Sequence, residues 1–212
     1  MQGSRSSPVL IVNILAHLPL FVAYGADALD KPSPAAATAS TLLHADPPPW
    51  QEKALTARWM VANTDWGVLS TSSVHLNGTA FGNPNSFVDG GNGSLYFYVT
   101  DRDASMQDVK ANPVCSFTLS EAMIPGRCNA AGDLDPEDPR CARLVFSGEW
   151  RRLPPHEALR VAAAMFDRHP QMKRWPADHG FYFGTLAISS IWLIDYFGGA
   201  TDIGVADYYA AA

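Results

Sequence analysis

Apolar residues recur with helical spacing in two segments of the chain, residues 50–63 and 154–169. In the first segment the apolar positions stand at i, i+4 and i+7, on Leu55, Trp59 and Ala62. This spacing predicts an amphipathic helix with a single buried stripe. The second segment opens on two prolines and carries a similar stripe, which predicts a second helix. A shorter helix is expected at residues 105–112, where Pro113 would end it.

Elsewhere the pattern changes to a period of two and is rich in β-branched and aromatic residues, which predicts strands. We expect strands at residues 66–74, 79–87, 95–100, 114–121, 142–153 and 181–197. Turn residues at Asn77-Gly78 and at 90–93 predict that the first three strands form a meander, and a bulge is expected near Ser189-Ser190. Because strands and helices do not alternate regularly, the pattern predicts an α+β protein whose sheet closes on itself.

The first 49 residues differ from the rest of the chain. Arg5, an apolar run at 9–22 and the small residues around Tyr24 predict a signal peptide at 1–25. The alternative is a membrane anchor, but the run is shorter than the roughly 20 residues that a span needs, and it contains Pro19. Residues 26–49 are rich in Pro and Ala and predict a flexible linker, followed by one domain at 50–212. The sequence therefore predicts a protein of the secretory pathway without stable membrane insertion.

Charge and sequons refine this picture. The net charge of -6 offers no attraction for phosphate backbones, so we expect no nucleic-acid partner. Asn77-Gly78-Thr79 and Asn92-Gly93-Ser94 are acceptor sequences for N-linked glycans, and Asn-Gly also favours a tight hairpin turn. The two interpretations are compatible, and we expect a glycan at Asn77 or Asn92.

Three cysteines in an oxidising compartment leave one pair and one free thiol. Cys128 and Cys141 bracket a loop that contains Gly132 and two prolines, whereas Cys115 lies in a predicted strand. We predict a Cys128–Cys141 disulfide and a buried Cys115. A Cys115–Cys128 pair remains the alternative.

The region from residue 168 to residue 199 carries a distinctive run of motifs. It holds Arg168-His169-Pro170, Met172-Lys173, Trp175-Pro176, Asp178-His179, Ile191-Trp192-Leu193 and Asp195-Tyr196-Phe197-Gly198-Gly199. With Asp65-Trp66-Gly67, Leu95-Tyr96-Phe97-Tyr98 and Asn112-Pro113, these motifs resemble the CREG family of secreted glycoproteins over about residues 50 to 209. The resemblance implies the FMN-binding-type split β-barrel of the pyridoxamine 5'-phosphate oxidase superfamily, with flanking helices, and a homodimer. It also implies a glycoprotein or sorting receptor as a partner.

Split barrels of that superfamily commonly hold flavin mononucleotide, and a buried phosphate requires cationic donors. Residues 70–93 contain no Lys or Arg, and Ser105 stands where flavin-binding relatives often place a lysine. Arg102 and Lys110 lie nearby at different spacings. If flavin binds, the candidate hydroxyls are those of Ser70, Thr71, Ser72, Ser86 and Ser105. The resemblance further implies that an inserted loop, here the acidic segment 128–141, fills the flavin pocket, so we expect no cofactor.

His169 and His179 form a possible metal pair with Asp167 or Asp178, but their spacing is not one that marks zinc sites. A hydrolytic triad would need a nucleophile elbow, and no Gly-x-Ser-x-Gly occurs. We therefore expect neither a metal nor catalytic residues, and we interpret both histidines as structural. The candidates for a partner surface are the motif residues Arg168, His169, Pro170, Trp175, Pro176 and His179.

Aromatic residues at 181–183, 192, 196 and 197 suggest either a ligand cage or barrel filling with a dimer seam, and we favour the second. The resulting hypothesis is a secreted, endolysosomal or vacuolar glycoprotein that acts through protein recognition without catalysis. The alternative is an FMN- or haem-dependent oxidoreductase.

Overall fold

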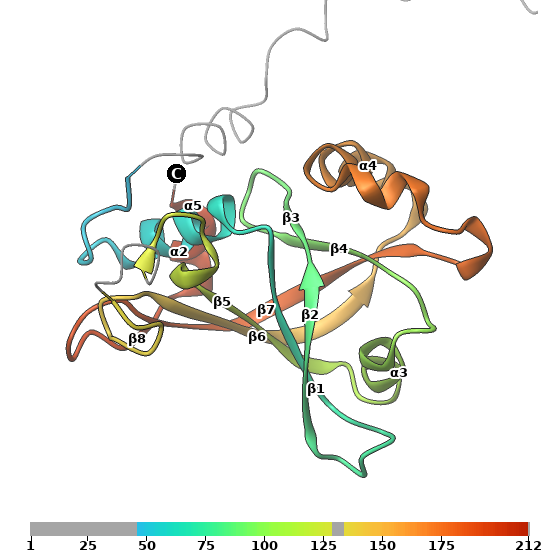
Figure 1. The fold of residues 1–212 in the computed structure, drawn as a ribbon, viewed down its shortest axis with the longest axis horizontal. Helices are drawn as coiled ribbons and strands as arrows, with labels where there is room; N and C mark the ends of the chain where they lie inside the picture. The colour runs from blue at the N-terminus through green and yellow to red at the C-terminus, as the bar shows by residue number, and fades with distance from the viewer. Residues whose placement is uncertain (1–45, 129–133, 212) are drawn as a thin grey trace, which may run out of the picture. The chain divides into compact units, whose positions relative to one another are not determined.

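Eight strands form one curled antiparallel sheet in the computed structural model, which describes residues 46–128 and 134–211 (Figure 1). The strand order is β2-β1-β5-β6-β7-β4-β3, and β8 pairs with β7. The strands are β1 Trp66–Ser72, β2 Ala80–Ser86, β3 Val88–Asp89, β4 Leu95–Val99, β5 Val114–Ser120, β6 Arg143–Arg152, β7 Tyr182–Ile194 and β8 Thr201–Asp202. The helices are α2 Lys53–Asn63, α3 Ala104–Ala111, α4 Pro155–Arg168 and α5 Val205–Ala210, with short 3-10 turns η2 Glu121–Met123, η4 Pro170–Arg174 and η5 Ala177–His179.

The two ends of the sheet path, β2 and β3, are consecutive in the chain. Phe87 alone separates them, and its backbone N–H donates to the carbonyl of Asp65 at 3.2 Å. The chain therefore passes from one edge of the sheet to the other at Phe87, which requires the sheet to curl. This arrangement confirms the predicted α+β split barrel with flanking helices.

The main core fills the inside of the curled sheet. Phe87, Phe97 and Phe117 pack edge to face or tilted, with ring centroids 4.9 to 6.3 Å apart, and all three are fully buried. A smaller cluster forms where α4 packs on the other side of β4, around Met165 and Phe183. Apolar burial in these two clusters is the main force that holds the fold.

Helix α2 differs from the prediction in its start and in its environment. It begins at Lys53 rather than at residue 50, and residues 56–62 are all buried, so the expected single stripe is wrong. The reason is that α2 contacts both β5 and α5, and α5 was not predicted. A helix covered on several sides cannot show its burial as a one-sided pattern.

The predicted meander is also wrong, because β4 pairs with β7 and β3 instead of β2.

The predicted bulge is confirmed. Ser147 pairs with Ser190 and Gly148 pairs with Ile188, which leaves Ser189 as the extra residue. A Cβ on Gly148 would lie 2.1 Å from the carbonyl oxygen of Ala187, so the close approach of the strands at the bulge requires glycine.

The structure contains the Cys128–Cys141 disulfide, with Cα atoms 5.8 Å apart. Closing a loop of this length stabilises a fold by about 3 kcal/mol in the chain-entropy account. Cys115 is a buried free thiol whose pKa is raised to about 11 by burial.

The described residues do not include Asp133 of the cysteine loop, the expected signal peptide or most of the expected linker. Within the described residues, no helix has the length and apolar character needed to cross a membrane.

Candidate functional site

Arg168 and His169, at the end of α4, tie three distant segments together. The Arg168 guanidinium donates to the Ala62 carbonyl at 2.6 Å and to the Asp65 carboxylate at 2.7 Å, and it thereby caps the C-terminus of α2. His169 is buried, and its Nε2 lies 2.9 Å from the carbonyl oxygen of Phe87. The first half of the motif thus holds the point at which the chain crosses between the sheet edges.

The second half of the motif forms one wall of a groove of about 410 Å³. Trp175 and Phe181 lie against Tyr98 of β4, with ring centroids 4.9 to 6.0 Å apart. The opposite wall is β2 from Pro84 to Ser86. His179 lies at the side of this groove and stacks on Phe181 at 6.1 Å. The structure therefore separates His169 in the interior from His179 near the groove.

Hydrogen bonds hold the groove walls in place. The Thr100 hydroxyl donates to the His179 carbonyl at 2.5 Å, and Arg102 donates to the Asp178 carbonyl at 3.1 Å. Both bonds join the end of β4 to the turn η5. A wall fixed in this way keeps its shape without a ligand.

The five candidate hydroxyls do not converge on one point. Thr71 faces the interior and is buried, whereas Ser70 and Ser72 alternate with it on the other face of β1. Ser105 is buried beside Asn83, whose amide donates to the Ser105 hydroxyl at 3.0 Å. Among the five, Ser86 is the residue that lines the groove.

Two carboxylates, which sequence reasoning overlooked, lie beside two of the candidate residues, Thr71 and Ser105. Asp108 is buried and accepts from the Thr71 hydroxyl at 2.7 Å and from the Val74 N–H at 2.8 Å. Asp103 caps α3 by accepting from the Ser105 N–H at 2.8 Å. Carboxylates beside these hydroxyls repel a phosphate dianion. The residues present therefore do not fit flavin mononucleotide. The available signal was the presence of three acids, Asp101, Asp103 and Asp108, within six residues of Arg102 in the sequence.

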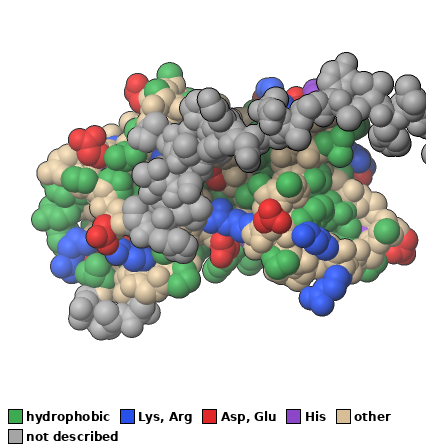
Figure 2. All heavy atoms as spheres, turned by 90° about the horizontal axis from the view of Figure 1, so that it is seen from above, with side chains coloured by type: hydrophobic (Ala, Val, Ile, Leu, Met, Phe, Trp, Pro, Cys, Tyr) green, Lys and Arg blue, Asp and Glu red, His purple; other side chains and the backbone are tan. Residues whose placement is uncertain are grey.

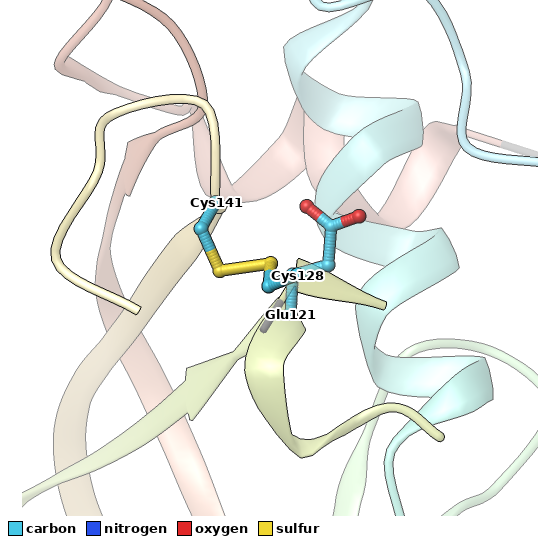
Figure 3. A group of neighbouring side chains, drawn as sticks. All are labelled: Glu121, Cys128 and Cys141. Atoms are coloured by element: carbon cyan, nitrogen blue, oxygen red, sulfur yellow. A yellow bond between two sulfur atoms is a disulfide. The ribbon is translucent and has the colours of Figure 1, made fainter. Parts of the chain in front are cut away.

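Glu121, Cys128 and Cys141 are the one potential metal-ligand group found among the described residues (Figure 3). The two sulfurs are joined to each other, and the Glu121 carboxylate accepts from Arg127 Nε at 3.0 Å and from the Ala142 N–H at 3.1 Å. All of these groups therefore have partners within the protein. The cluster anchors the start of the cysteine loop.

The cysteine loop follows β5 at its Ser120 end, whereas α3 precedes β5 at its Val114 end. The described part of the loop is absent from the groove lining. Arg140 instead lies over the Phe197 ring at 5.6 Å, and its hydrogen bonds lower the pKa of Asp138 to about 2.

The aromatic residues of the C-terminal region are dispersed over the molecule. Phe183 belongs to the cluster under α4, Trp192 is partly exposed on the outer face of β7, and Tyr196 stacks on Trp50 at 4.9 Å. Only Phe181 lines the groove. These residues therefore do not form a single cage.

Both sequons lie on exposed turns. Asn77 has a positive φ of 54°, which suits the tight turn between β1 and β2. Asn92 lies in the turn between β3 and β4, which is held by two N–H donors, of Gly91 and Gly93, to the Asp89 carboxylate. Burial raises the pKa of Asp89.

On the side of the sheet away from the main core, two adjacent rows of side chains across the strands carry no charged residue. Four serines stand directly opposite one another across four strands, at Ser70, Ser116, Ser147 and Ser190. The neighbouring row is largely apolar and runs through Pro84, Val68, Thr118, Val145 and Trp192. We call these two rows the outer face.

Charged side chains on the face shown in Figure 2 are interspersed, with both signs present. The described residues visible there therefore present no continuous basic surface of the kind that binds nucleic acid.

Comparisons with known proteins identify relatives across most of the chain. A family model described as CREG, beta-barrel matches residues 48–210. Protein CREG1 of Gallus gallus is 37% identical over 182 residues, covering 82% of this chain and 94% of the relative. Protein CREG2 of Homo sapiens is 36% identical over 171 residues, covering 78% of this chain and 58% of the relative.

Solved structures show the same fold at low identity. The heme binding protein from Mycobacterium smegmatis has a TM-score of 0.60 and 18% identity, covering 78% of this chain and 62% of that chain. HutZ, the heme storage protein from Vibrio cholerae, has a TM-score of 0.50 and 13% identity, covering 66% of this chain and 93% of that chain. These similarities support the split-barrel assignment.

We predict that His169→Ala lowers the free energy of unfolding by about 1 to 3 kcal/mol, because the buried Phe87 carbonyl loses its imidazole partner. Urea unfolding followed by tryptophan fluorescence measures this change. His156→Ala is the control, since that side chain is 77% exposed and should shift stability by less than about 0.5 kcal/mol. Equal effects of the two substitutions would contradict the structural role of His169.

Proposed function

The chain belongs to the CREG family, and we propose that it is a secreted, endolysosomal or vacuolar glycoprotein that acts by recognising other proteins. In this proposal the barrel is a scaffold without a flavin and without catalysis. Its partners are a second copy of the chain and a glycoprotein or sorting receptor. The residues that would meet a receptor are the exposed ones of the motif, Pro170, Trp175 and Pro176, together with the half-buried His179.

The pair Asp103 and Asp108 is the observation that carries the non-flavin part of the proposal. A bound phosphate needs positive charge or several free donors. Here the Thr71 hydroxyl already donates to Asp108, and the Ser105 N–H already donates to Asp103. Binding flavin mononucleotide would bring its dianion next to these carboxylates and would break bonds that satisfy buried groups.

We predict that the full chain purified from a secretory host is colourless near 450 nm and gives no saturable flavin fluorescence quenching when titrated with flavin mononucleotide. The same titration with hemin should give no saturable Soret shift. A stoichiometric flavin in the purified protein would support the oxidoreductase alternative. A specific Soret band would support its haem-dependent form, for which the heme binding and heme storage proteins of the same fold are the precedent.

The outer face supports a homodimer. Its two rows hold small hydroxyls and apolar side chains and no charged residue. An uncharged surface of this kind favours packing against its own copy, since a two-fold interface brings each patch onto the same patch of the partner.

We therefore predict that the wild-type chain sediments as a dimer and that Val145→Glu, in the centre of the apolar row, shifts it toward monomer by at least about tenfold in dissociation constant. The matched control is Leu159→Glu on α4, where the side chain is 79% exposed and far from this face. A wild-type monomer in analytical ultracentrifugation, or an unchanged Val145→Glu dimer, would exclude this interface.

Glycosylation is tested at the two turns. We expect peptide N-glycosidase F to increase the electrophoretic mobility of the chain from a eukaryotic secretory host, because both asparagines are exposed. Asn77→Gln and Asn92→Gln assign the site, and Asn85→Gln, which lies outside any sequon, is the control. A mobility that the enzyme does not change would refute the glycoprotein part of the proposal.

A further inference from the structure

The described residues that line the groove beside Tyr98 include an acidic side chain and no basic one. Asp103 is its acidic side chain, and none of the described residues that line it is Lys, Arg or His. The pKa of Tyr98 is raised by burial, so the phenol is neutral at physiological pH. The groove therefore combines a carboxylate with aromatic rings and lacks a resident counter-ion.

The charges at the rim do not reverse this balance. Arg102 is exposed and donates to the backbone carbonyl of Asp178, whose own carboxylate is exposed in the same turn. Lys173 and Arg174 are also exposed nearby, in η4. None of these charged side chains lines the groove, and solvent screens them. The charge that a ligand inside the groove meets is that of Asp103.

The aromatic wall offers a binding surface that the described protein leaves partly open. Trp175 is 39% exposed, and Tyr98 and Phe181 are half-buried. The planes of Tyr98 and Trp175 differ by 17°, and those of Tyr98 and Phe181 by 23°. Because the rings stack on one another, the part of this wall most open to a ligand is the exposed Trp175 ring, and aromatic faces attract both flat apolar groups and cations.

Hydrogen bonds orient the Asp103 carboxylate and leave it able to accept further bonds from a ligand. Asp103 accepts from the Ser105 N–H at 2.8 Å and from the Asn83 amide at 3.2 Å. A carboxylate has about four acceptor sites, so these bonds orient it without exhausting its capacity. The volume of about 410 Å³ lies in the range of small-molecule sites.

We propose that this groove binds a small organic cation, in which an ammonium group is attached to a flat apolar body. The flat body stacks on the wall formed by Tyr98, Trp175 and Phe181, and the ammonium group is paired with Asp103. This assignment goes beyond the protein-recognition role, because it gives the barrel a small-molecule ligand of the charge opposite to that of flavin phosphate.

Isothermal titration of the full chain tests the proposal with three probes of similar size: benzyltrimethylammonium, benzyl alcohol and benzenesulfonate. We expect the cation to bind at least about fivefold more tightly than the neutral alcohol, as a cation-π contact reinforced by a partly exposed carboxylate should give. The anion should bind most weakly. No saturable binding of benzyltrimethylammonium up to millimolar concentration, or equal binding of cation and alcohol, would overturn the proposal.

Two variants locate the site. Asp103→Asn keeps an N-cap side chain for α3, so the fold is preserved, and it should weaken the cation about two- to fivefold while leaving benzyl alcohol unchanged. Trp175→Leu should weaken both probes, the cation by about fivefold. Trp50→Leu removes a similarly exposed tryptophan outside the groove and is the control. If Asp103→Asn binds the cation as tightly as the wild type, the charge assignment is wrong.

Discussion

The fold depends on the crossing at Phe87, where the chain leaves one edge of the sheet and joins the other. Both polar backbone groups of this fully buried residue have partners: its N–H donates to Asp65 and its carbonyl faces His169 Nε2. A buried peptide group without partners is costly, so these two bonds make the crossing possible. Arg168 adds a link from the same turn to Asp65. The curled sheet follows from this junction, and the groove follows from the curled sheet.

What the region between β1 and α3 can bind is set by which of its polar groups already have partners. Hydroxyls at positions such as Thr71 can serve as phosphate donors in principle, but a hydroxyl has one proton to donate, and here it goes to Asp108. The same two carboxylates that repel an anion order α3 and the turn after β1, through Ser105 and Val74. Restoring a phosphate site would therefore require new cations and also new partners for these backbone groups.

Local patterns in the sequence predicted elements well and pairings poorly. Strand alternation located β1, β5, β6 and β7 to within a few residues, and the bulge at Ser189 was anticipated from its paired serines. The meander failed because the partner of β4 is β7, which lies about ninety residues away, and turn residues carry no information about such distant pairing. The burial of α2 was missed for a similar reason, since α5 is a short helix at the far end of the chain.

At the site, the sequence indicated the absence of Lys and Arg from residues 70–93, but not the presence of Asp108 beside the Thr71 hydroxyl. A helix such as α3 turns some residues toward β1 and others outward, and only the packed structure shows that Asp108 points inward. The motif illustrates the same limit. Its residues are contiguous, yet Arg168 and His169 hold the barrel together, whereas Trp175 forms part of an open wall. Substitutions in its first half should therefore act through stability, and those in its second half through binding, so one contiguous motif has two separable physical roles.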